Sequence, residues 1–209
     1  DLKRLSVDEL QLLCNDVRQT IIEVLSKNPG HFSSSLGAVE LAVGIHHVFN
    51  TPNDKLIWDV GHQAYAHKIL TGRQAKFKSI RQKGGLSGFP KMSESEFDSF
   101  GTGHSSTSLS AILGMATAAK LDNKLSQHIA VIGDGALTGG IAFEALNNAA
   151  SSGANVLIII NDNNMSIDDN VGALQDHLNT ISTNETSLFE NLNIPFYGVI
   201  NGNDIYEVI

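Results

Sequence analysis

The sequence has little cysteine, a deficit of basic residues and no long hydrophobic run. Its single cysteine, Cys14, excludes an internal disulfide, so a reducing compartment is the default expectation. The longest uninterrupted apolar run covers residues 156–160, which is far too short to cross a bilayer. With 14 basic against 22 acidic residues, the net charge of −8 disfavours nucleic acid or an anionic membrane as the main partner.

The remaining composition is that of a folded domain. The chain has 209 residues, of which 42% are hydrophobic and 17% charged, enough for one sizeable α/β domain. Its N-terminal residues are polar and show no signal-peptide core. We therefore expect a soluble, cytoplasmic protein.

The first half of the chain is predicted to be mainly helical. Ser6 and Glu9 form a capping-box pattern, and apolar residues at helical spacing follow until Pro29 and Gly30. Other elements are expected at residues 36–49 (helix), 56–58 (strand), 64–70 (helix), 73–83 (helix with a solvated basic face) and 84–108 (a long loop). Loops of this length are often functional.

The second half is predicted to hold a parallel sheet. Residues 129–132 and 156–160 are apolar runs typical of buried strands, and a helical pattern at 141–150 lies between them. A further strand is expected at 196–200. Strand, helix and strand in this order predict an α/β fold, a parallel sheet with helices on both faces.

Polar residues follow both apolar runs. Asp134 stands between Gly133 and Gly135 after the first run, and residues 161–165 after the second contain three asparagines. Ligands of open parallel sheets bind beyond the carboxyl ends of the strands, and carboxylate and amide oxygens suit Mg²⁺. Gly-Asp-Gly alone is better explained as a turn than as a ligand site. Together with an Asn-rich strand end 27 residues beyond Gly135, it predicts a site for Mg²⁺ and a diphosphate.

This spacing is that of the thiamine diphosphate motif, and further segments extend the likeness. The sequences HFSSSLG at 31–37, GHQAYAHKILTGR at 61–73, GHSSTS at 103–108 and GDGA at 133–136 resemble the 1-deoxy-D-xylulose-5-phosphate synthase family. Transketolases share the general plan but not the second or third of these segments. The resemblance covers almost the whole chain and implies a thiamine diphosphate-binding fold.

The resemblance implies a reaction and its partners. The family condenses pyruvate with D-glyceraldehyde 3-phosphate, with loss of CO₂, to 1-deoxy-D-xylulose 5-phosphate. This product feeds isoprenoid precursor, thiamine and pyridoxal synthesis, and the resemblance implies a cytoplasmic homodimer. Two alternatives remain open: another transketolase-type enzyme, or a module that holds Mg²⁺ and a diphosphate without catalysis.

The resemblance also implies roles for individual residues. Asp134 and Asn163 would bind Mg²⁺ through side-chain oxygens, and Met165 through its backbone carbonyl because a thioether is too soft a ligand. Two histidines, His31 and His62, match catalytic residues near the reacting carbon, where a near-neutral pKa suits proton transfer. The implied cofactor-binding residues are His62, Gly103, His104, Ser105, Gly135, Ala136 and Asn163.

Four further residues receive lesser roles. Ser34 matches a family serine near the acceptor site. His46 and His47 lie inside a predicted helix and are interpreted as structural, and Cys14 as a small core residue.

The chain departs from the family pattern in two places. The family carries some tens of extra residues where Thr183 is followed by Asn184, which predicts either a gap in the chain or a deletion. The family also continues with a pyrimidine-binding and a C-terminal domain. We therefore interpret residues 1–209 as the diphosphate- and Mg²⁺-binding N-terminal domain, and expect this domain alone to be inactive.

Overall fold

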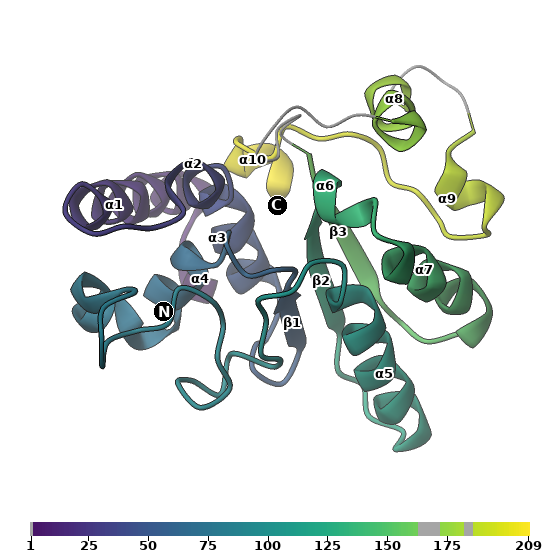
Figure 1. Ribbon diagram of the computed structural model, residues 1–209, viewed down its shortest axis with the longest axis horizontal. Helices are drawn as coiled ribbons and strands as arrows, with labels where there is room; N and C mark the ends of the chain where they lie inside the picture. The colour runs from purple at the N-terminus through teal and green to yellow at the C-terminus, as the bar shows by residue number, and fades with distance from the viewer. Residues whose placement is uncertain (1, 163–171, 182–185) are drawn as a thin grey trace.

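One parallel sheet organises the fold. The computed structural model describes residues 2–162, 172–181 and 186–209 (Figure 1). In these residues β1 (Lys55–Trp58), β2 (His128–Gly133) and β3 (Leu157–Asn161) pair in parallel in the order β1-β2-β3. Trp58 lies opposite Val131, and Gly133 opposite Asn161. All three strands therefore end at the same edge, as the sequence predicts.

Helices cover both faces of the sheet. Leu56, Trp58 and Val131 pack into a core with α1 (Val7–Leu25) and α3 (Val39–Val48). Ile57 and Ala130, which point to the other face, pack against α5 (Ser108–Leu121) and α7 (Gly140–Ser152). Figure 1 shows α1 to α4 on one side of the strands and α5 and α7 on the other. The predicted α/β class with helices on both faces is confirmed.

The other helical elements are short. They are η1 (Leu2–Arg4), α2 (Phe32–Leu36), α4 (Tyr65–Lys68), η2 (Ile69–Arg73), η3 (Gln74–Ser79), α6 (Asp134–Leu137), α8 (Ala173–Thr180), α9 (Leu188–Asn191) and α10 (Ile205–Val208). Among the described residues, no helix has the length and apolar character needed to span a membrane.

The first helix forms as its sequence predicts. The Ser6 hydroxyl accepts a hydrogen bond from the Glu9 backbone N–H, and the Glu9 carboxylate accepts one from the Ser6 N–H. Cys14 lies on the buried face of α1 and is fully buried, which confirms its role in the core. Burial, and secondarily Glu40, raises the pKa of the Cys14 thiol to about 12, so the thiol stays protonated.

The helices differ from the prediction in two places. The helix expected at 36–49 begins later, as α3 at Val39, because the backbone leaves helical geometry at Ala38; the separate short helix α2, which ends at Leu36, precedes it. Helix α5 is not predicted at all, because Gly114 and several small residues weaken its apolar periodicity.

Two further predictions are wrong. Residues 73–83 form only the short η3, and the backbone then turns so that the Arg81 N–H reaches the Leu86 carbonyl. Of the basic residues in this segment Arg73 is buried rather than solvated. Residues 196–200 form no strand, because they have no strand to pair with among the described residues, and Tyr197 and Val199 are largely exposed.

A chain of hydrogen bonds connects three buried side chains, His46, His67 and Asp98, to the partly buried Thr51. His67 Nε2 lies 2.9 Å from Asp98 Oδ1, His67 Nδ1 lies 2.9 Å from His46 Nε2, and His46 Nδ1 lies 3.0 Å from Thr51 Oγ1. Because an ionised carboxylate only accepts, each imidazole donates from Nε2 and accepts at Nδ1. The chain thus holds both rings in one neutral tautomer and supports the structural role of His46.

Acidification is expected to destabilise the fold through His46. Burial, together with His67, lowers the pKa of His46 from 6.5 to about 3. Between these two pKa values the unfolded chain binds more protons than the folded chain. The free energy of unfolding therefore decreases as the pH is lowered, by about 2 kcal/mol from pH 7.5 to pH 5 from this group alone. Urea unfolding of the wild type and of His46→Gln should show a flatter pH dependence in the variant. His47→Gln, on the same helix, should keep the wild-type slope, and an equal slope in all three proteins would contradict the assignment.

Candidate functional site

The candidate site begins at the carboxyl end of β2. Asp134 directly follows this strand, starts α6 and is buried, with 4% of its surface exposed. Gly135 and Ala136 follow in the first turn of α6 and are partly exposed. The sequence thus places a carboxylate and two small residues where a parallel sheet presents ligands.

Asp59 connects the end of β1 to the loop that carries GHSSTS. Its carboxylate accepts hydrogen bonds from the backbone N–H groups of Ser106, at 2.8 Å, and Ser108, at 3.0 Å. Ser108 is the first residue of α5, whose own N-cap residue makes no side-chain capping bond. Asp59 therefore caps α5 from a different element and places its charge at the favourable end of the helix.

The same loop is attached to the end of β2. The Ser106 hydroxyl donates to the Ala136 carbonyl at 2.7 Å. A Cβ at Gly139 would lie 2.2 Å from the Ser106 oxygen, so only glycine allows this close approach. These contacts bring Gly103, His104 and Ser105, all exposed, to the edge that holds Gly135 and Ala136.

The backbone of Gly103 and the side-chain amide of Asn161 complete this edge. Gly103 has a φ of +151°, and a Cβ there would meet nothing within 4 Å, which leaves its backbone open to a ligand. The Asn161 amide, at the end of β3, donates to the Gln63 side-chain oxygen at 2.5 Å. The ends of all three strands are therefore joined by side-chain hydrogen bonds.

The structure brings His31 and His62 together. Their ring centroids are 6.0 Å apart in an edge-to-face arrangement. The Ser35 hydroxyl donates to the His62 carbonyl at 3.0 Å, and the His31 backbone N–H donates to the Tyr65 hydroxyl at 3.4 Å. Both Nδ1 atoms are buried and have no hydrogen-bond partner in the part of the chain that the structure describes. Such unpartnered atoms point to a ligand.

Both imidazoles are held in the neutral form. Burial lowers the pKa of His31, and the positive charge of Arg81 and the repulsion between the two imidazoles when protonated lower it further. Burial also lowers the pKa of His62, partly opposed by the carboxylate of Asp59. Neutral imidazoles in a partly buried pair can both accept and donate a proton near pH 7.

Some predicted site residues fall outside this description. Asn163, Met165 and the junction between Thr183 and Asn184 lie outside the described residues. Ser34 is partly exposed on α2, next to Ser35. Within the described ranges no three His, Cys, Asp or Glu side chains form a group that could hold a metal. Mg²⁺ needs only one or two carboxylates beside waters and a phosphate, which a single Asp134 fits.

Three residues that hold the strand edge together, Asp59, Gln63 and Ser35, are not among the sequence predictions. The strand-end rule that identifies Asp134 also applies to Asp59, because Asp59 directly follows Trp58 of β1. Ser35 and Gln63 act through long-range contacts that no local pattern indicates.

Replacing Asp59 with asparagine is expected to destabilise the fold by about 2–3 kcal/mol, because the amide group would face one of the two backbone N–H donors. Urea unfolding measures this change. Asp122→Asn removes an equally charged but exposed side chain and should change the free energy of unfolding by less than about 0.5 kcal/mol. A variant of Asp59 as stable as the Asp122 control would show that the carboxylate does not hold the loop.

Comparison with known proteins identifies a family that matches most of the chain. The family model described as 1-deoxy-D-xylulose-5-phosphate synthase matches residues 1–187. The synthase of that name from Parabacteroides distasonis is 57% identical over 186 residues, which cover 88% of this chain and 29% of the relative. The one from Cytophaga hutchinsonii is 46% identical over 250 aligned positions, which cover all of this chain and 39% of the relative.

A solved structure shows the same fold at low sequence identity. A transketolase variant from Pichia stipitis superimposes with a TM-score of 0.75 at 20% identity, over 98% of this chain and 33% of that one. The chain thus spans about a third of the length of the proteins it matches. The match over residues 1–187 and the identities of 46–57% establish that the chain belongs to the 1-deoxy-D-xylulose-5-phosphate synthase family.

Proposed function

We propose that this chain is the diphosphate- and Mg²⁺-binding N-terminal domain of a thiamine diphosphate-dependent synthase. The whole enzyme would condense pyruvate with D-glyceraldehyde 3-phosphate, with loss of CO₂, to 1-deoxy-D-xylulose 5-phosphate. The observation that carries this proposal is the joined strand edge, where Asp59 and Ser106 hold the GHSSTS loop against the start of α6. Family membership supports the choice of reaction.

The described residues fit the diphosphate end of the cofactor. Asp134 offers a buried carboxylate for Mg²⁺, which we propose is completed by Asn163 and the Met165 carbonyl. The open backbone at Gly103 supports close approach of a phosphate. The diphosphate would lie against Gly103, His104, Ser105, Gly135 and Ala136. When bound, thiamine diphosphate supplies the electron sink for decarboxylation, which no side chain can provide.

The histidines would serve the substrate end. His31 and His62 have buried, unpartnered Nδ1 atoms and lowered pKa values, which suit proton transfer to or from a bound carbonyl oxygen. The edge-to-face packing of the two rings limits their rotation and would keep both nitrogens directed at one reacting group. We assign Ser34 to the acceptor side of the same space.

Family membership supports a proposal for the setting of the enzyme. We propose a cytoplasmic homodimer whose product feeds isoprenoid, thiamine and pyridoxal synthesis. A pyrimidine-binding and a C-terminal domain would complete each subunit.

Substrate profiling of the full-length protein tests the proposal. CO₂ release from pyruvate that depends on glyceraldehyde 3-phosphate, with 1-deoxy-D-xylulose 5-phosphate as product, is the expected result. Transfer of a hydroxyacetyl group between sugars would favour the alternative of a transketolase. Binding of thiamine diphosphate without turnover of either substrate set would favour the non-catalytic module.

A further inference from the structure

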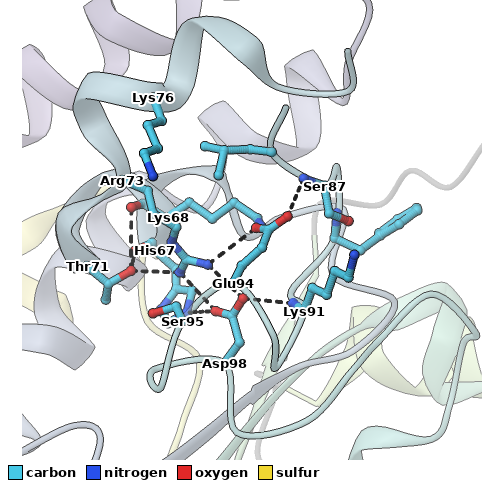
Figure 2. Close-up of polar contacts among 12 residues, drawn as sticks. His67, Lys68, Thr71, Arg73, Lys76, Ser87, Lys91, Glu94, Ser95 and Asp98 are labelled. Atoms are coloured by element: carbon cyan, nitrogen blue, oxygen red, sulfur yellow. Dashed lines mark hydrogen bonds and ion pairs between the residues drawn. The ribbon is translucent and has the colours of Figure 1, made fainter. Parts of the chain in front are cut away.

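A cluster of three buried charged side chains and one partly buried one lies beside the candidate site. Lys68 is fully buried, and its ammonium lies 2.6 Å from the Glu94 carboxylate. The Arg73 guanidinium donates to both oxygens of the buried Asp98, at 2.7 and 2.9 Å, and lies 3.8 Å from Glu94. Figure 2 shows these four side chains converging from α4, η2 and the long loop. We call Lys68, Arg73, Glu94 and Asp98 the ion cluster.

Both carboxylates of the ion cluster hold the backbone of one short segment. The second oxygen of Glu94 accepts from the Ser87 N–H at 2.6 Å, and Asp98 accepts from the Lys91 N–H at 2.7 Å (Figure 2). Each carboxylate thus connects a buried cation to one end of residues 87–91. Charge-assisted bonds of this kind fix geometry more tightly than neutral ones.

The segment held in this way covers the histidine pair. Phe89 is the central residue of this segment, and its ring centroid lies 5.3 Å from the ring centroid of His31. Pro90 packs on Gly61, the residue before His62, so closely that a Cβ on Gly61 would lie 2.4 Å from the proline ring. Residues 87–91 therefore form one wall of the space occupied by the two imidazoles.

The ion cluster is well suited to fixing this wall in place. Burial favours the neutral acid, but hydrogen bonds from His67 and Arg73 outweigh it and hold the pKa of Asp98 below its ordinary value. Burial lowers the pKa of Lys68, opposed by the hydrogen bond to Glu94. Buried ion pairs add little net stability over apolar residues of equal volume, but a well-paired network enforces one arrangement.

We propose that Glu94 and Asp98 are positioning residues that hold residues 87–91 against His31 and keep water from its imidazole. The catalytic meaning of this arrangement rests on the proposed function, whereas the arrangement itself does not. The groups that face His31 are Arg81 after η3, His62 after β1, the Tyr65 hydroxyl on α4 and Phe89 in the wall.

Hydrogen–deuterium exchange at the imidazole C2 position, followed by mass spectrometry over a range of pH, tests the proposal in the full-length apo-protein. It reports a pKa and an exposure for each histidine separately. In Glu94→Gln and Asp98→Asn, release of the wall should speed exchange at His31 several-fold and raise its pKa toward the ordinary value near 6.5. The sign is informative, because loss of an acidic charge alone would lower the pKa of a nearby imidazole or leave it unchanged.

Three controls separate positioning from general loosening. Glu96→Gln removes an equal but exposed charge from the same loop and should leave His31 as in the wild type. His128, buried at the start of β2, should be unchanged in every variant. Phe89→Ala, which leaves the ion cluster intact, should reproduce the shift at His31 even if the cluster variants do not fold.

The outcomes are distinct. An unchanged His31 in folded Glu94→Gln and in Phe89→Ala would overturn the proposal, as would equal shifts at His31 and His128. If the His31 shift occurs but the protein fails to condense pyruvate with glyceraldehyde 3-phosphate, the positioning role stands and the proposed function falls.

Discussion

Replacing Asp134 with alanine in the full-length protein is expected to abolish Mg²⁺-dependent binding of thiamine diphosphate. Asp134 is the one buried carboxylate at the start of α6 among the described residues, directly after β2. Mg²⁺ is held by one or two carboxylates and by phosphate oxygens, so loss of this anion leaves the metal without its main protein charge. Titration calorimetry with and without Mg²⁺ measures the effect.

A conservative variant keeps this experiment interpretable. Asp134→Asn preserves the size of the side chain and one oxygen, so binding should be weakened by at least about tenfold without loss of the fold. Circular dichroism checks the folding of both variants. Unchanged cofactor affinity in a folded Asp134→Ala protein would show that Asp134 does not bind the metal.

The 209-residue chain by itself is expected to show no turnover. In the proposed enzyme, loss of the cofactor's C2 proton would depend on a glutamate carboxylate that polarises the far end of the aminopyrimidine ring, and no segment of this chain matches such a glutamate. Loss of a charge-assisted hydrogen bond in a dry site costs several kcal/mol of transition-state stabilisation, which is a rate loss of about several hundredfold or more. Expression of residues 1–209 with Mg²⁺, thiamine diphosphate and both substrates, followed by CO₂ release, measures this.

Turnover within about tenfold of the full-length enzyme would mean that the carboxylate lies in this chain. The structure narrows the choice among three candidates. Glu40 is buried and accepts two hydrogen bonds from Arg18, at 2.9 and 2.8 Å. Glu190 belongs to the capping box of α9, and Glu144 lies exposed on α7. Glu144 would then be the first residue to replace.

Local patterns predict those parts of the fold that local physics determines. The capping box at Ser6 and the apolar runs of β2 and β3 need no distant partner to be recognised. The segment at 196–200 has the apolar content of a strand, but a strand also needs a neighbour, and none is present among the described residues. Helix α5 shows the opposite case, because contacts with β2 and α7 form a helix that its weak periodicity does not indicate.

The candidate site likewise contains residues that local sequence patterns predict and residues that depend on long-range contacts. Asp134 and its glycines are predictable because a strand end is a local feature with a known place in a parallel sheet. The hydrogen bond between Asp59 and Ser106 joins residues 47 positions apart in the sequence, and the ion pair between Asp98 and Arg73 joins residues 25 positions apart. Asp98 lies in a loop without periodicity, and charged loop residues are ordinarily solvated. Only the folded structure reveals that Glu94 and Asp98 are partners of buried cations.

A crystal structure of the full-length protein with thiamine diphosphate and Mn²⁺ tests the central claim most directly. Mn²⁺ replaces Mg²⁺ at oxygen sites and is located by its anomalous scattering. We predict Mn²⁺ bound to the Asp134 carboxylate and the diphosphate, with the diphosphate against Gly135 and the loop at Gly103. A metal bound away from Asp134, or a diphosphate away from this strand edge, would contradict the account.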